Sequence, residues 1–351
     1  MVRAVALLLV VVIHCAAWPA QRSGAPHLLY PGLTLASQVS VPLFVVLSGL
    51  LLSHVGGGQT RRWAFWRRRL GRTVGPWVCW AAVFFAIAVL GAHMSPNPVR
   101  TWGWWAGGAG HLYFLLLIPQ LYLLLLVWPR GRRASAVALV VAGAVQVGLQ
   151  LLRVLAPLHG PAATILLDFG FEEAPLWVGY FALGIFLGRH QGWLGSGARW
   201  APAVLALAVA SEVVLFVGPV GLIARHWGPW VGGTGAFLRP TLLLTTALVF
   251  TLLWWAAPAL LGRGGRGMRR VVAEGSRHSL GIYIVHPLFL LVVGPQLQRA
   301  PAPLSLEQGL PGSLLPFAVL VAGAAVSGWW VSRLLAASRW TAWTVGVAPT
   351  R

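Results

Sequence analysis

Arg3 and His14 are the first candidates for a chemical role in this sequence. They lie eleven positions apart in an otherwise apolar run, and eleven residues make about three helical turns, so both side chains fall on one face. His14 then lies ~16 Å along the axis from Arg3. A neutral imidazole can take a proton from a hydroxyl group. The pair therefore indicates a general base with a cation on the same face. The alternative is a core histidine bonded to a backbone carbonyl, with Arg3 acting as an orientation signal.

A second histidine stands late in the chain, in the run SLGIYIVHPLF. Tyr283 and His286 are three positions apart and share a helix face. Pro287 follows and can kink the helix. The spacing is compatible with a functional pair, and equally with a plain interhelical hydrogen-bond pair.

A basic segment, RRWAFWRRRLGR, occupies residues 61–72 and is predicted to form the inner loop after the second apolar helix. Arginine binds phosphate in a bidentate manner, so Arg67, Arg68, Arg69 and Arg72 could hold a polyphosphate ligand. From sequence alone the stronger interpretation is a topology signal that also meets anionic head groups.

Few other residues suggest chemistry. Ser48-Gly49 indicates close helix contact. Glu212 is isolated in an apolar run, as either a buried ion-pair partner or a site acid. The chain has no lysine, which excludes a Schiff-base lysine, and its two cysteines make neither a disulfide framework nor a zinc site. No metal site is predicted.

The amino-acid composition indicates whether these residues belong to a soluble protein or to a membrane protein. The hydrophobic set makes up 58% of the 351 residues and charged residues only 9%, whereas soluble domains carry about 25% charged residues. Mean hydropathy is +0.77. A soluble enzyme is excluded, and a disordered chain is a poor interpretation because the sequence is too apolar. Nucleic-acid binding is a poor interpretation despite the net charge of +20, because the positive charge comes in short blocks between apolar runs, as in the loops of multi-pass membrane proteins.

The hydropathy pattern predicts an all-α, polytopic membrane protein with ten spanning helices, since about 20 apolar residues cross a bilayer. The predicted spans are 2–18, 37–55, 73–91, 111–128, 134–156, 175–188, 200–220, 238–256, 278–296 and 313–336.

The arginines predict the orientation. With a cytoplasmic amino terminus, 20 arginines fall in inner segments and five in outer loops, which follows the positive-inside rule and places both termini in the cytoplasm. The alternative for the first segment is a cleaved signal peptide. The inner arginines are Arg3, Arg61, Arg62, Arg67, Arg68, Arg69, Arg72, Arg130, Arg132, Arg133, Arg189, Arg199, Arg263, Arg266, Arg269, Arg270, Arg277, Arg333, Arg339 and Arg351.

Taken in order, these motifs resemble the membrane-bound acyltransferase-3 family of O-acyltransferases. The family signature Arg-X10-His is matched by Arg3 and His14. Similar runs follow: VPLFVVLSGLLLS, where Leu50 replaces the usual Phe; RRRLGRTVGPW; GHLYFLLLIPQLYLLL, where Tyr113 stands for the common Trp; VGYFALGIFLGR; and SLGIYIVHPLF. The likeness covers nearly the whole chain and agrees with ten helices.

The resemblance implies a single transmembrane acyltransferase domain over residues 1–351, without a fused soluble domain, in the plasma membrane. It implies an acyl group, most often acetyl, taken from cytoplasmic acyl-CoA as co-substrate, with no permanently bound cofactor. The acceptor would be a hydroxyl of a glycan, a lipid-linked sugar or a small metabolite. Membrane lipids are the other expected partners, and nucleic acid is not one. The alternative function is a secondary transporter or glycan flippase.

The expected roles follow from the same resemblance. His14 is the general base. Arg3 and some of Arg67, Arg68, Arg69 and Arg72 meet the phosphates of the donor. The candidates for orienting the acceptor or stabilising the oxyanion are Ser48, Tyr113, Glu212, Tyr283 and His286. Direct transfer and a covalent acyl-histidine intermediate both remain open.

Overall fold

The computed structural model describes residues 1–22, 29–54, 63–91, 105, 109–155, 173–192, 200, 202–207, 209–210, 241–299, 312 and 314–347. Throughout these ranges the chain forms helices, turns and short connections, and no strand occurs among them. Apolar helices suit a bilayer because each satisfies its own backbone hydrogen bonds. The all-α fold class is confirmed for the described residues.

Seven described helical segments are long and apolar enough to cross a membrane, and two further apolar helices are shorter. Together they correspond to nine of the ten predicted spans; the span at 200–220 lies mostly outside the described residues. The exact span number and the orientation of the termini stay predictions. The long segments are Gly32–Leu52, Trp63–Leu90, Gly110–Val127, Arg132–Leu152, Leu242–Arg263, Ser279–Leu297 and Leu314–Ala336, and the shorter ones Val2–Ala17 and Val178–Arg189.

The chain divides into two compact units, described here separately. The first comprises Met1–Phe44 and Leu194–Leu334. Its helices are α1 (Val2–Arg22), α2 (Leu29–Ala36), the short 3-10 helix η1 (Ser37–Val39), the start of α3 (Ser40–Leu52), α16 (Leu242–Arg263), α17 (Gly265–Arg277), α18 (Ser279–Arg299) and most of α19 (Leu314–Ala336).

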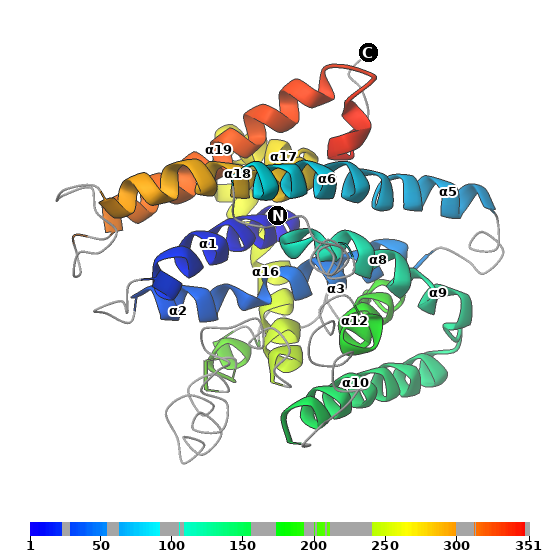
Figure 1. Ribbon diagram of the computed structural model, residues 1–351. Coiled ribbons are helices and arrows are strands. Elements are labelled where there is room, and N and C mark those ends of the chain that lie inside the picture. Colours follow the sequence, from blue (N-terminus) through cyan, green and yellow to red (C-terminus); the bar gives the residue numbers. More distant parts are fainter. Residues whose placement is uncertain are drawn as a thin grey trace. The chain divides into compact units, whose positions relative to one another are not determined.

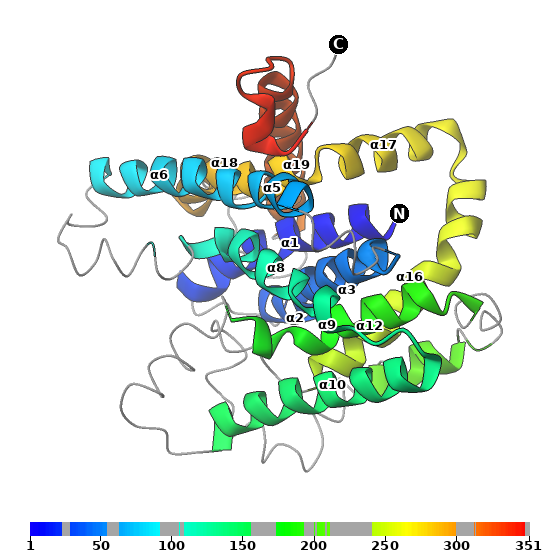
Figure 2. The same cartoon turned by 90° about the vertical axis from the view of Figure 1, so that its right-hand side faces the viewer.

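Helix α1 is central to the first unit. It packs against α2, η1 and α18, and its contacts extend to α16 and α17. Helices α1 and α18 run in the same direction in both views (Figure 1, Figure 2). Because they are parallel neighbours, groups on their facing sides can meet although hundreds of residues separate them in the sequence.

The second unit comprises Val45–Trp193 and Leu335–Arg351. Besides the end of α3, its helices are α5 (Trp63–Gly71), α6 (Val74–Leu90), η2 (Gly110–Tyr113), α8 (Phe114–Tyr122), α9 (Leu124–Val127), α10 (Arg132–Leu155), η3 (Ala174–Leu176), α12 (Val178–Arg189) and η7 (Ala342–Val345). The carboxyl-terminal segment is anchored on α6, where the Trp80 indole donates to the Thr344 carbonyl at 3.0 Å.

Arg189 ties three parts of this unit together. Its Nε donates to the Ser53 carbonyl at 2.9 Å, and Nη1 donates to the Pro129 carbonyl at 2.8 Å. These carbonyls follow the ends of α3 and α9, where helices leave backbone acceptors without intrahelical donors. One planar guanidinium thus fixes the end of α12 to the ends of two other helices.

Helix α3 lies unusually close to α12 because glycines line the contact. A Cβ built on Gly49 would overlap the Phe181 carbonyl oxygen, and one built on Gly184 would overlap the Val46 carbonyl oxygen. At Gly188 a Cβ would meet the Ser53 hydroxyl. Small residues allow this approach, in which helix backbones touch. The close helix contact predicted from Ser48-Gly49 is confirmed.

We expect Gly184→Leu to disrupt this contact. The added side chain would collide with main-chain atoms that cannot rotate away, and overpacking of this kind costs about 1–3 kcal/mol or more. The measurement is thermal unfolding and size-exclusion behaviour in detergent. Gly148→Leu on α10 is the matched control, because nothing lies within 4 Å of the Cβ position there. Equal stability of the two variants would contradict the described packing.

Candidate active site

Helix α1 carries both residues of the first predicted pair. It is continuous from Val2 to Arg22, so Arg3 and His14 are joined by uninterrupted helical turns and share a face as predicted. Arg3 is exposed at the start of the helix, and His14 is half-buried further along. Between them lie apolar residues, including the buried Ala6, Val10 and Val11. The sequence therefore places one cation at the helix end and one imidazole at its apolar middle.

His14 meets His286 of α18. The two ring centroids are 5.0 Å apart, with an angle of 50° between the ring planes. The sequence identified both histidines as candidates but did not predict that they are neighbours. The structure brings them together within the first unit.

His286 is fully buried, and its orientation is set by its own helix. Its Nδ1 lies 3.1 Å from the Ile282 carbonyl oxygen. A carbonyl can only accept, so Nδ1 carries the hydrogen, and in the neutral ring Nε2 is then an acceptor. A buried imidazole with a fixed tautomer beside His14 can receive a proton or orient a hydroxyl group.

Tyr283 completes this group. It is buried on α18, and its ring centroid lies 6.5 Å from that of His286. Pro287 has no N–H, so the Tyr283 carbonyl does not receive the usual helical hydrogen bond. The predicted shared face of Tyr283 and His286 is confirmed. The group His14, Tyr283 and His286 is named here the histidine cluster.

The start of α18 is held in place by a third histidine. His278 Nδ1 and the Ser332 hydroxyl of α19 are 3.0 Å apart, and both side chains are buried. Glu274 lies 3.8 Å from His278 Nε2. Burial lowers the pKa of His278 below its ordinary 6.5; Glu274 opposes this, and Arg277 and Arg333 add to it. A neutral His278 thus fastens α18 to α19 one turn before Tyr283. This positioning role was not predicted from the sequence, although a histidine directly before an apolar helix is a visible signal.

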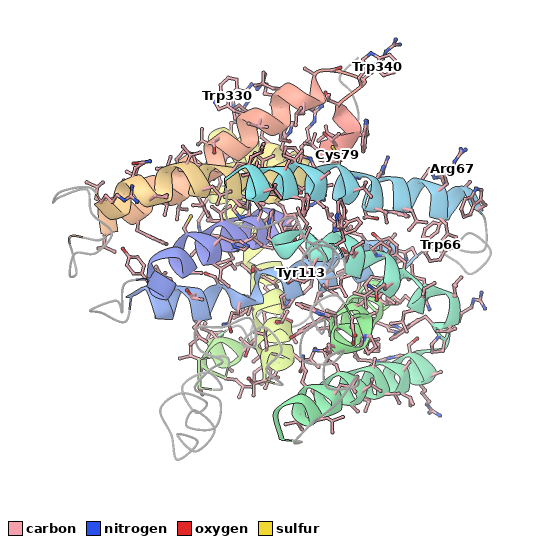
Figure 3. The ribbon with its side chains drawn as sticks, viewed as in Figure 1. Trp66, Arg67, Cys79, Tyr113, Trp330 and Trp340 are labelled. Atoms are coloured by element: carbon pink, nitrogen blue, oxygen red, sulfur yellow. The ribbon has the colours of Figure 1, made fainter. Side chains whose placement is uncertain are left out.

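Apart from Arg3, which belongs to the first unit, the arginines predicted to meet the donor belong to the second unit. Residues Trp63–Gly71 form helix α5, so the predicted loop is largely helical. The chain turns at Arg72, and the Thr73 hydroxyl donates to the Arg69 carbonyl at 3.1 Å. Arg67, Arg68 and Arg72 are exposed, and Figure 3 shows Arg67 on α5. Arg69 is half-buried, with its guanidinium 5.6 Å from the Phe65 ring centroid.

Ser48 and Tyr113 also belong to the second unit. Ser48 is half-buried on α3 beside the glycine contact with α12. Tyr113 is half-buried at the end of η2, and its ring centroid lies 6.1 Å from that of the buried Trp177 (Figure 3). Their roles toward an acceptor stay predictions. Glu212 lies outside the described residues.

The family of the chain follows from comparison with known families. Residues 1–333 match the acyltransferase-3 family model, described as an acyltransferase domain. The chain belongs to the acyltransferase-3 family. The resemblance suggested by the motifs is thereby confirmed over nearly the whole chain. No curated protein and no solved structure shows a significant match.

Membership in the acyltransferase-3 family decides between the two functions considered from sequence. The protein is an acyltransferase, and its apolar helices make it a membrane enzyme. A transporter without acyl-transfer chemistry is therefore not favoured. The match concerns the domain as a whole and assigns no role to Arg3, His14 or any other single residue.

Proposed function

We propose that this membrane acyltransferase moves an acyl group, acetyl in the simplest case, from acyl-CoA to a hydroxyl group, with His14 as general base. The observation that carries the proposal is the contact of His14 with His286, at 5.0 Å between ring centroids. Burying two imidazoles in an apolar environment costs free energy. Ionisable groups within membrane-spanning helices therefore mark functional sites. General-base catalysis supplies typically 10²–10⁴-fold in rate.

The reaction balances with these groups alone. His14 takes the proton from the acceptor hydroxyl as its oxygen attacks the thioester carbonyl. The tetrahedral intermediate collapses with cleavage of the carbon–sulfur bond, and the imidazolium returns the proton to the leaving thiolate. The products are the ester and free CoA thiol. The Tyr283 hydroxyl orients the acceptor or stabilises the oxyanion, and His286, whose Nε2 is a hydrogen-bond acceptor, orients the acceptor hydroxyl. A covalent acyl-histidine intermediate balances equally well and would form when donor and acceptor arrive at different times.

The proposed binding site for acyl-CoA consists of arginine side chains. The phosphates of acyl-CoA are multiply charged and suit bidentate guanidinium partners. We assign them to Arg67, Arg68, Arg69 and Arg72; a role of Arg3 toward the donor stays a prediction from the sequence. The proposed acceptor is a glycan, a lipid-linked sugar or a small metabolite, and the proposed location is the plasma membrane with both termini in the cytoplasm.

Substitution of Arg69 and Arg72 tests the donor assignment. We expect Arg69→Gln/Arg72→Gln to raise the KM for acyl-CoA on the order of tenfold or more while kcat changes less, because phosphate contacts remote from the thioester contribute uniform binding. The measurement is release of CoA thiol by purified enzyme in detergent. Arg132→Gln/Arg133→Gln on α10 removes equal charge as a control. An unchanged KM would contradict the donor assignment and would support the interpretation of the α5 arginines as a topology signal.

A further inference from the structure

Helix α17 is amphipathic in a way that the acyl-transfer reaction does not use. Its sequence is GRGMRRVVAEGSR. Arg266, Arg270 and Arg277 stand at spacings of four and eleven from the first, and these positions share one face of a helix with 3.6 residues per turn. All three are exposed. One side of α17 is therefore a stripe of guanidinium groups.

The opposite side of α17 is apolar and also exposed. Met268, Val271, Val272 and Gly275 follow the spacing of one helical face. Val271 is 72% exposed and Met268 45% exposed. Helix α17 has no buried residue. A helix of a soluble domain would bury such a face against the protein core. In this protein the face is exposed and can contact another apolar environment.

The arginine stripe is not neutralised within the described part of its unit. Glu274 is the one acidic residue among the described residues of the first unit, and it lies beside His278 at 3.8 Å. In that part of the unit no ion pair to Arg266, Arg270 or Arg277 is found. An uncompensated row of guanidinium groups selects an anionic partner, and phosphate oxygens suit it best.

The position of α17 between two apolar helices indicates which environment surrounds it. It connects α16 to α18, both long and apolar enough to span a membrane. Its thirteen residues measure ~20 Å and carry five charged side chains, so α17 itself does not span. Gly265, at φ +62°, makes the sharp turn by which α17 leaves α16 (Figure 2). A segment between two spanning helices lies at the membrane surface.

We infer that α17 lies in the plane of the membrane interface and binds anionic phospholipid head groups. The apolar face with Val271 enters the acyl-chain boundary, and the arginine stripe meets the head-group phosphates, as in interfacial amphipathic helices. Because α17 contacts α1 and leads directly into α18, bound lipid also fixes the ends of the two helices that carry His14 and His286.

Charge removal tests lipid binding. The full-length protein in detergent is titrated with phosphatidylglycerol and with phosphatidylcholine, and bound lipid is counted by native mass spectrometry. Each arginine near an anionic surface is worth roughly a fivefold gain in affinity, so Arg266→Gln/Arg270→Gln/Arg277→Gln should lose on the order of a hundredfold for phosphatidylglycerol. The control is Arg130→Gln/Arg132→Gln/Arg133→Gln. An equal loss in both variants would overturn the assignment to α17.

A second arm separates lipid from the phosphates of the acyl donor. Adenosine 3′,5′-bisphosphate carries two of the three phosphates of CoA, at the same ribose positions, without the acyl arm. We expect it to leave phosphatidylglycerol binding unchanged at millimolar concentration. Displacement of the lipid by this nucleotide would overturn the proposal and assign the arginine stripe to the donor.

The in-plane position is tested independently of activity and of lipid affinity. Spin labels are placed at Val271→Cys and Ala273→Cys, on opposite faces of α17, with Cys15 and Cys79 replaced by serine. In nanodiscs containing phosphatidylglycerol, the label at 271 should be accessible to dissolved oxygen and protected from an aqueous nickel complex, and the label at 273 should show the reverse. Equal nickel accessibility at both positions would overturn the proposal.

Discussion

A His14→Ala variant is expected to lose acyl transfer by a factor of about 10²–10⁴, the usual contribution of a general base. The acceptor hydroxyl would have no group to take its proton, since the alanine methyl group neither accepts nor relays one. The loss should fall on kcat, because the imidazole acts in the transition state rather than in donor binding. The measurement is CoA thiol release against acyl-CoA concentration in detergent.

Controls separate chemistry from folding. His14→Gln keeps a polar side chain on α1 and is expected to be as inactive as the alanine variant, because an amide is not a base at neutral pH. His54→Ala removes an exposed histidine just after α3 and is expected to leave activity unchanged. All three variants should elute as folded protein. Activity of His14→Ala within tenfold of the wild type would remove His14 from the mechanism.

The sequence was sufficient for those features that depend on helical periodicity. The shared face of Arg3 and His14 needs only a continuous helix, and α1 provides it. The pairing of Tyr283 with His286 needs only a spacing of three, and α18 provides that. Apolar run length likewise placed nine of the ten predicted spans where described apolar helices are found, seven of them long enough to cross a membrane.

Features that depend on packing between distant helices could not be predicted in this way. The contact of His14 with His286 requires α1 and α18 to pack against each other, and no periodicity within either helix encodes that. The same holds for His278 and Ser332, which belong to different helices. The helical state of α5 was missed for another reason: its arginines were interpreted as loop charge, although arginine is a good helix former.

The second large effect is expected at His286. Replacing it with phenylalanine keeps a ring of similar size beside His14 and removes both nitrogen atoms. We expect His286→Phe to lower kcat on the order of a hundredfold, because the buried ring that orients the acceptor or shares its proton is lost while the contact between α1 and α18 persists. Tyr283→Phe, which removes one hydroxyl group from the same cluster, is the matched variant and is expected to lose less.

The pH dependence of kcat/KM distinguishes a chemical role of His286 from a structural one. The acid limb of that profile reports the protonation of the essential base in the free enzyme. Since the His286 ring lies 5.0 Å from that of His14, its removal changes the electrostatic surroundings of the base and should displace the limb. A variant in which only the packing of α1 against α18 was weakened would lose activity equally at every pH. A His286→Phe enzyme with wild-type kcat and an unmoved acid limb would leave His14 to act alone, and the histidine cluster would then be a packing contact.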